Sequence, residues 1–177
     1  MRRVAIIGCG GAGKTSLSLE LGRVLDLPVV HIDAQYWRGS DGSPSERWPE
    51  LHRELVAGDA WIVEGMKPGT LAERLKRADT VIFLDLPRRT CIRGVVERRL
   101  RFRRRPRPEL GRPDRVTLAY LRWVWRFPHD VRPAVRAALA SCQCEVVTLR
   151  RRHEIDAYVG GLRVVRVEPT GDAVLHL

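Results

Sequence analysis

A loop suited to nucleotide phosphates lies near the amino terminus, where residues 8–15 read GCGGAGKT and follow the apolar run 4–7. The glycines permit positive φ and let backbone N–H groups point at a polyphosphate. We expect Lys14 to reach the β and γ phosphates and the Thr15 hydroxyl to bind Mg²⁺, while the following helix directs its positive dipole end at the same anion. The pattern therefore predicts a site for ATP and Mg²⁺ formed by Gly8, Gly10, Gly11, Ala12, Gly13, Lys14, Thr15 and Ser16.

A carboxylate and two aromatic residues follow the second apolar run: Asp33, Tyr36 and Trp37. Ligands of parallel α/β sheets bind at the carboxyl ends of the strands, so these side chains are expected to face the cleft. Asp33 is predicted to bind or deprotonate the hydroxyl of a phosphate acceptor, with Tyr36 and Trp37 beside it. The alternative is that Asp33 caps a turn or a helix. His31 lies on the same face and could orient Asp33, although a histidine at a strand end is more often structural.

Two acidic residues, Glu64 and Asp85, compete for the role of holding Mg²⁺ through water opposite Thr15. Asp85 follows a hydrophobic strand, as a Walker B carboxylate does. Glu64 ends the third predicted strand, nearer the acceptor pocket, and is also a candidate acceptor-binding residue. Either could instead cap the segment that follows it, so the sequence leaves the choice open.

Seven arginines are concentrated in residues 98–107. Like charges repel, so a polyanion is expected to neutralise several of them. Arg99 and Arg103 are four residues apart on one predicted helix face and could both reach a triphosphate, while Arg107 could fold over it as an arginine finger. Nucleic acid is an alternative partner for the same residues, but we find no helix-turn-helix or zinc-finger motif beside them.

Composition narrows the class of protein. The chain has 177 residues, which suits one domain, and a net charge of +11. Only three of its 32 basic residues are lysines, and such a skew can reflect an arginine-biased genome as easily as a nucleic-acid surface. The four cysteines lack metal-site spacing and are interpreted as small buried hydrophobic residues. No apolar stretch approaches the ~20 residues of a membrane span, so we expect a cytoplasmic protein with no membrane partner.

Short apolar runs alternate with amphipathic segments, which predicts an α/β fold with a five-stranded parallel sheet and helices on both faces. Strands are expected at 4–7, 28–32, 60–63, 80–85 and 145–149. Helices are expected at 14–25, 44–58, 70–78, 88–103, 115–127, 132–140 and 152–159. The helix at 44–58 is predicted from a capping box that starts at Ser43. The tail is predicted to form a hairpin of segments 162–167 and 173–177.

With these motifs in this order, the chain resembles the small P-loop kinases of the adenylate kinase-like, nucleoside monophosphate kinase group. It looks most like the bacterial adenylate kinase-related proteins named DNA topology modulation proteins. The resemblance rests on residues 4–16, 28–37, 59–65, 69–71, 78–87, 107–108 and 121–126. In the adenylate kinase pattern an arginine after the third strand grips the acceptor phosphate. Here the stretch is Glu64-Gly65-Met66-Lys67-Pro68, so Lys67 could substitute, but the guanidinium fork is lost.

The resemblance implies a P-loop kinase domain at 1–161, with an acceptor-binding segment at 34–58, a lid at 98–114 and a C-terminal extension at 162–177. We expect a Mg²⁺-dependent phosphotransferase that moves the γ-phosphoryl of ATP to a nucleoside monophosphate or a hydroxyl-bearing small molecule. Lys14, Asp33, Arg99, Arg103 and Arg107 are the predicted catalytic residues. The alternative is a nucleotide-binding regulatory protein that binds nucleic acid.

Overall fold

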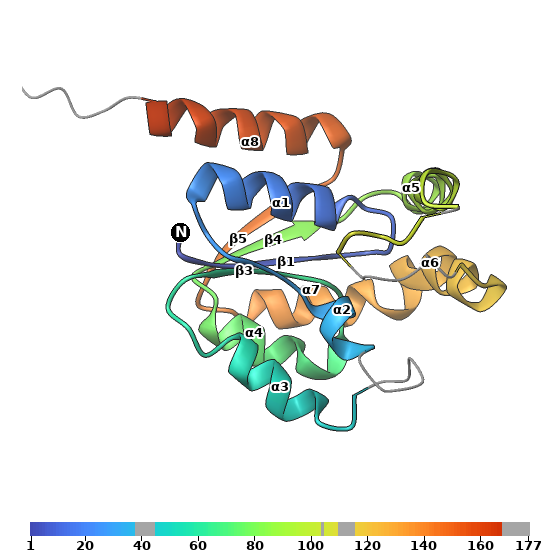
Figure 1. The fold of residues 1–177 in the computed structure, drawn as a ribbon, viewed down its shortest axis with the longest axis horizontal. Coiled ribbons are helices and arrows are strands. Elements are labelled where there is room, and N and C mark those ends of the chain that lie inside the picture. The colour runs from blue at the N-terminus through green and yellow to red at the C-terminus, as the bar shows by residue number, and fades with distance from the viewer. Residues whose placement is uncertain (38–44, 104, 110–115, 168–177) are drawn as a thin grey trace, which may run out of the picture.

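The computed structural model describes residues 1–37, 45–103, 105–109 and 116–167. Its centre is a five-stranded parallel sheet in the order β2-β3-β1-β4-β5 (Figure 1). The strands are β1 (Arg3–Gly8), β2 (Val29–His31), β3 (Trp61–Glu64), β4 (Thr80–Leu84) and β5 (Glu145–Leu149). Residues 4–7 are 0% exposed because β1 is the middle strand and helices cover both of its faces. The predicted sheet is confirmed.

The helices form a layer on each side of the sheet (Figure 1). One layer holds α1 (Lys14–Leu25) and α8 (Arg152–Val167), and the other holds α3 (Trp48–Leu55), α4 (Leu71–Arg77) and α7 (Arg132–Ala140). Beyond the carboxyl ends of the strands, α5 (Arg88–Arg101) packs against α6 (Leu118–Asp130). Two short helices, α2 (Ile32–Tyr36) and η1 (Pro68–Thr70), follow β2 and β3. Within the residues that the structure describes, no helix is both long and apolar enough to cross a bilayer.

The predicted helix 44–58 is wrong at its amino end, since α3 begins at Trp48. Ser43 and Pro44, which carried the predicted cap, lie outside the described residues. The backbone N–H of Ser45 donates to the carbonyl of Tyr36 at 2.7 Å, and that of Trp48 donates to Ser45 at 3.1 Å. These bonds make residue 45 part of a turn, which a capping pattern read along the chain does not reveal.

The first half of the predicted C-terminal hairpin is also wrong, because α8 continues through Val167. Gly160 and Gly161 lie inside this helix despite their low helix propensity. The helix packs on α1, with Val159 buried and Arg163 ion-paired to Glu20 at 2.6 Å. Tertiary contacts therefore outweigh the local signal of the two glycines. Residues 173–177, the second half of the predicted hairpin, lie outside the described part.

Smaller differences concern helix ends. The short helix α2 was not predicted. Helix α5 ends at Arg101 instead of residue 103, and α6 begins at Leu118, where the Thr117 hydroxyl accepts a hydrogen bond from the Tyr120 N–H at 3.1 Å. Helix α6 also continues past its predicted end, through Pro128, to Asp130.

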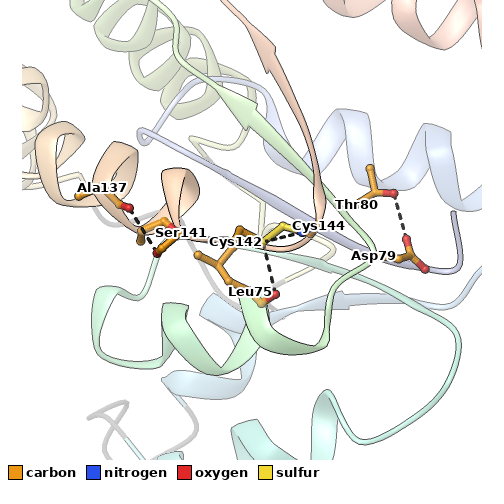
Figure 2. The surroundings of a disulfide bond; sticks show 8 residues. Leu75, Asp79, Thr80, Ala137, Ser141, Cys142 and Cys144 are labelled. Atoms are coloured by element: carbon orange, nitrogen blue, oxygen red, sulfur yellow. Dashed lines mark hydrogen bonds between the residues drawn. A yellow bond between two sulfur atoms is a disulfide. The ribbon is translucent and has the colours of Figure 1, made fainter.

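The interpretation of all four cysteines as small buried hydrophobic residues is wrong for the two that lie between α7 and β5. Figure 2 shows Cys142 and Cys144 joined by a disulfide, with their Cα atoms 5.3 Å apart. That separation falls within the usual range for a bridge. The Cys144 N–H donates to the Cys142 sulfur at 3.3 Å, and the same sulfur lies 3.6 Å from the Leu75 carbonyl. The bridge lies at the amino end of β5, opposite the edge where the chemistry is expected. Cys9 and Cys91 are free and buried, as predicted.

Candidate functional site

The predicted phosphate-binding loop, residues 8–15, connects the end of β1 to the start of α1. Gly8, Gly11 and Gly13 have φ of 145°, 79° and 99°, conformations in which a side chain would be strained. Gly13 is the left-handed residue that precedes Lys14, so α1 starts directly behind the loop with its N–H groups pointing into it. The loop has the backbone that an anion-binding turn needs.

Two glycines of the loop also allow neighbouring helices to approach, a requirement that the sequence analysis did not recognise. A Cβ on Gly11 would collide with the Cys91 carbonyl of α5, and one on Gly10 would collide with the Tyr120 hydroxyl of α6. Helices α5 and α6 therefore pack directly on the loop.

The Lys14 side chain is buried, with 9% of the residue exposed. Its ammonium group donates to the carbonyl of Cys9 at 2.9 Å, so it lies over its own loop. A lysine in this place is a cation held at the point where the loop would receive phosphate oxygens. The contact is to a backbone carbonyl and not to a carboxylate, which leaves the positive charge available for an anion.

Glu64 is the carboxylate nearest the loop. It lies at the end of β3, paired in register with Ile6 of β1 and His31 of β2. One oxygen, Oε1, accepts a hydrogen bond from the Thr15 hydroxyl at 3.2 Å and lies 2.8 Å from His31 Nδ1. Burial raises the pKa of Glu64, but the bond to His31, the charge of Lys14 and the bond from Thr15 outweigh it. The Glu64 pKa therefore lies below its ordinary value, and the group is a carboxylate at neutral pH.

Asp85, the other acidic candidate, is engaged elsewhere. Its side chain is 3% exposed, and its two oxygens form ion pairs with Arg132 at 2.8 Å and Arg136 at 2.7 Å. Both arginines belong to α7. The carboxylate thus joins the end of β4 to α7, an arrangement that explains its burial without a metal.

Asp33 and Lys67 meet in front of this edge of the sheet. The Lys67 ammonium lies 3.5 Å from Asp33 Oδ1, 3.6 Å from the centre of the Tyr36 ring and 4.9 Å from that of Trp37. Asp33 belongs to the first turn of α2, a short helix that directly follows β2. The side chain of Asp33 is 44% exposed and that of Lys67 is 19% exposed. The four predicted acceptor-binding residues of this cluster are thus brought together, while Glu64 lies by Thr15.

The arginine segment is arranged differently from the prediction. Arg99 is exposed on α5, but Arg103 follows the end of that helix, so the two do not share a helix face. Arg107 is buried, with its guanidinium ion-paired to Glu109 at 2.5 Å. Arg98 lies 6.0 Å from the centre of the Tyr120 ring, next to the phosphate-binding loop.

A buried arginine that the sequence analysis missed lies beneath the acceptor cluster. Arg74 of α4 is 0% exposed and donates to the carbonyls of Gly65 at 3.0 Å and Lys67 at 3.3 Å. The signal was present, since residue 74 falls on the helical stripe with Leu71, Leu75 and Ala78, which are all buried. Because arginine is rarely buried unless it is paired, an arginine on an apolar stripe indicates a buried side chain with hydrogen-bond partners.

A cavity of about 450 Å³ opens between the amino ends of α5 and α8, at the carboxyl ends of β4 and β5. Its volume is within the range of small-molecule sites. Residue 93 of α5 lines it, two positions from Cys91, whose carbonyl faces Gly11 of the loop. The lining residues are Leu86, Pro87, Arg89, Thr90, Arg93, Arg150, Arg151 and Arg152. No group of three or more His, Cys, Asp or Glu side chains suited to a metal ion occurs in the described ranges.

Solved structures share this architecture. A shikimate kinase from Acinetobacter baumannii, in complex with shikimate, has a TM-score of 0.57 and 16% identity over 95% of this chain and 96% of that one. A shikimate kinase from Bacteroides thetaiotaomicron has a TM-score of 0.53 and 20% identity over 93% and 98%. A deoxyadenosine kinase from M. mycoides, with bound dCTP, has a TM-score of 0.51 and 14% identity over 91% and 98%. The chain therefore has the P-loop kinase fold.

Sequence comparison gives a partial match. A tRNA dimethylallyltransferase from Corynebacterium jeikeium is 42% identical over 79 residues, which is 41% of this chain and 24% of that protein. The chain thus spans about a quarter of the length of this relative. No protein-family model matches the chain.

Proposed function

We propose that this protein is a Mg²⁺- and ATP-dependent phosphotransferase that acts on a hydroxyl-bearing small molecule or a nucleoside monophosphate. The proposal rests on the spatial order of the charged groups along one edge of the sheet. Lys14 lies at the loop, Glu64 bonds to Thr15, and Asp33 and Lys67 follow. A donor phosphate, a metal and an acceptor hydroxyl would need these groups in this order. The kinase fold of the structural neighbours supports the same reaction class.

Hydroxyl and carboxylate oxygens are the ligands that Mg²⁺ prefers, so Thr15 and Glu64 fit this ion. When bound, Mg²⁺ supplies positive charge to the phosphates of ATP. His31 would hold the Glu64 carboxylate in place from the side of β2. Asp85, with both oxygens paired to arginines, is less suited to this role. We assign the metal to Thr15 and Glu64.

In the reaction that we propose, Lys14 exchanges the Cys9 carbonyl for phosphate oxygens and stabilises the charge of the transferred group. Asp33 accepts the proton of the acceptor hydroxyl as its oxygen attacks the γ-phosphorus, and ADP leaves from the far side. For this, Asp33 must part from Lys67, which would turn to an anionic group of the acceptor. Tyr36 and Trp37 would line the acceptor pocket as part of the predicted acceptor-binding segment 34–58, of which residues 38–44 lie outside the described residues.

The donor base would occupy the cavity between α5 and α8, since that cavity lies beside the loop and has room for a purine nucleoside. The predicted lid at 98–114 would lie over ATP, with Arg99, Arg103 and Arg107 neutralising the triphosphate; residue 104 and residues 110–114 of this segment lie outside the described residues. We also propose that the protein is one of the DNA topology modulation proteins and that it is cytoplasmic.

A coupled assay of ADP release, run over nucleoside monophosphates, nucleosides and small hydroxyl compounds, tests the proposal directly. We expect one chemical class of acceptor to raise ADP production well above the basal hydrolysis of ATP. Compounds that carry an anionic group beside the hydroxyl are the first to try because Lys67 can pair with it. A full screen without acceptor-dependent ADP release would contradict the kinase assignment.

The choice between the two acidic residues gives a matched pair of variants. Glu64→Gln keeps the shape of the side chain and removes its charge, so we expect the Mg²⁺ concentration for half-maximal turnover to rise about tenfold or more. Asp85→Asn should instead leave the Mg²⁺ requirement unchanged and lower Tm, because it leaves Arg132 and Arg136 without their carboxylate. Mg²⁺ titrations of steady-state turnover, with thermal melts, measure both effects. The opposite pattern would move the metal to Asp85.

The lid arginines give a further prediction. If residues 98–107 close over ATP, Arg103→Ala and Arg107→Ala should each lower kcat by ~10²-fold or more, with the exposed Arg105→Ala as control. Glu109→Gln separates a structural role of Arg107 from a chemical one, since it breaks the same ion pair but keeps the arginine. Equal losses in Arg107→Ala and Glu109→Gln would show that the pair only maintains the fold.

The second candidate is a nucleotide-binding protein that acts on or binds nucleic acid. Its support is the identity to part of a tRNA dimethylallyltransferase, together with the net charge of +11. On the kinase proposal, binding to tRNA or DNA should be weak and sequence-blind and should fall steeply with salt. Fluorescence anisotropy with labelled tRNA and duplex DNA at two salt concentrations distinguishes the two candidates. Tight, selective binding that Arg103→Ala and Arg107→Ala abolish, with ATP turnover intact, would favour this second candidate.

A further inference from the structure

Arg74 is the most completely buried charged side chain beside the candidate site, and it does not face the expected ligands. A buried guanidinium is rare unless it is paired, because its desolvation costs several kcal/mol. Its hydrogen bonds go to two main-chain carbonyls, those of Gly65 and Lys67, at 3.0 and 3.3 Å. Its Nε has no hydrogen-bond partner among the described residues. The segment to which Arg74 donates these hydrogen bonds explains why the cost of burying it is tolerated.

The segment that Arg74 holds carries a predicted functional residue at each end. Glu64 lies immediately before Gly65 and bonds to Thr15, and Lys67 ends the segment beside Asp33. Gly65 has a φ of 138°, and a Cβ there would collide with Ile32 of α2. The segment is thus held by the close approach of α2 at Gly65 and by the hydrogen bonds of the guanidinium. A shift of its two carbonyls would move Glu64 and Lys67 together.

Arg74 is a cation despite its burial. Burial lowers the pKa of Arg74 to about 10, and the carboxylates of Asp33 and Glu64 act in the opposite direction. The guanidinium therefore remains protonated at neutral pH. A charged guanidinium has only donor groups, which suits the two carbonyls that it holds.

We infer that Arg74 is a positioning residue for phosphoryl transfer. It touches neither donor nor acceptor. Its two hydrogen bonds hold segment 65–67 so that Glu64 remains beside Thr15 and Lys67 beside Asp33. This inference rests on the proposed function and extends it to a residue outside the reacting cluster.

Three variants separate the hydrogen bonds of Arg74 from its charge. Arg74→Lys keeps the charge and loses the fork, and Arg74→Met loses both while keeping an unbranched stem. Lys76→Met, on the exposed face of the same helix, is the matched control. We expect Arg74→Lys to lower kcat by about 10- to 100-fold and to raise the KM of the acceptor, with the KM of ATP little changed. Lys76→Met should leave both constants as in the wild type.

The split between kcat and the two KM values is the readout that a merely structural role would not move. A variant that is only less stable loses active molecules but keeps the KM of both substrates, whereas a displaced segment 65–67 raises the KM of the acceptor alone. Arg74→Met, which loses both hydrogen bonds, should show the same split with a larger fall in kcat. If Arg74→Met does not fold, the kinetic split of Arg74→Lys decides alone. Wild-type constants in a folded variant would overturn the inference.

The proposed function and the role of Arg74 are tested by separate measurements. The wild type alone tests whether any acceptor is phosphorylated. Without an acceptor, the variants are compared in the basal hydrolysis of ATP, where a displaced Glu64 should raise the required Mg²⁺ concentration about tenfold. An unchanged Mg²⁺ requirement in Arg74→Lys and Arg74→Met would overturn the role of Arg74 whatever the acceptor.

Discussion

Lys14→Ala is expected to abolish ADP production, with a fall in turnover of at least ~10³-fold, because the Lys14 ammonium is the cation that the structure holds over the loop. In the described structure the Lys14 ammonium donates to the Cys9 carbonyl. The substitution therefore removes this one hydrogen bond together with the positive charge. Coupled ADP release at saturating ATP measures the effect.

The fold should survive this substitution. Lys14 faces the loop and not the apolar core, and alanine has the highest helix propensity, so Tm is expected to change by only a few degrees. Arg23→Ala, on the exposed surface of the same helix, is the control for loss of a positive charge. Unchanged ADP production in a folded Lys14→Ala protein would contradict the kinase assignment.

Asp33→Asn is expected to lower phosphoryl transfer by ~10²–10⁴-fold, the loss typical of a missing proton acceptor or positioning group. Asparagine keeps the size of the side chain and removes the charge that pairs with Lys67. The affinity for ATP should change little, because the phosphate-binding loop and Lys14 are untouched. Steady-state kinetics with varied acceptor, and nucleotide binding measured by calorimetry, separate the two quantities.

The competing explanation is that Asp33 only stabilises the start of α2, where it lies in the first turn. In that case the variant would melt at a lower temperature and turn over normally. Asp26→Asn is a suitable control, since Asp26 is exposed in the turn before β2 and its φ of 56° is tolerated by asparagine. Normal turnover of Asp33→Asn would remove Asp33 from the catalytic residues.

The amino-acid sequence determined the sheet and the glycine-rich loop at residues 8–15 between β1 and α1. Both signals are local, because a buried parallel strand is an apolar run and the loop is a fixed spacing of glycines with Lys14 and Thr15. The sequence also placed Asp33, Glu64 and Asp85 correctly at strand ends, since parallel strands bring their carboxyl ends to one edge. These features depend on residues that are close along the chain.

Tertiary structure decided which of these residues meet. Glu64 joins Thr15 while Asp85 joins Arg132 and Arg136, a difference set by strand order and helix packing that no local pattern encodes. The same reason explains why α8 continues through two glycines, because contacts with α1 outweigh local propensity. Arg74 lies beneath Gly65 and Lys67 because α4 folds back against the strand end that precedes it. Spacing along the chain indicates which groups could act, and packing across the sheet determines which of them lie within reach of one another.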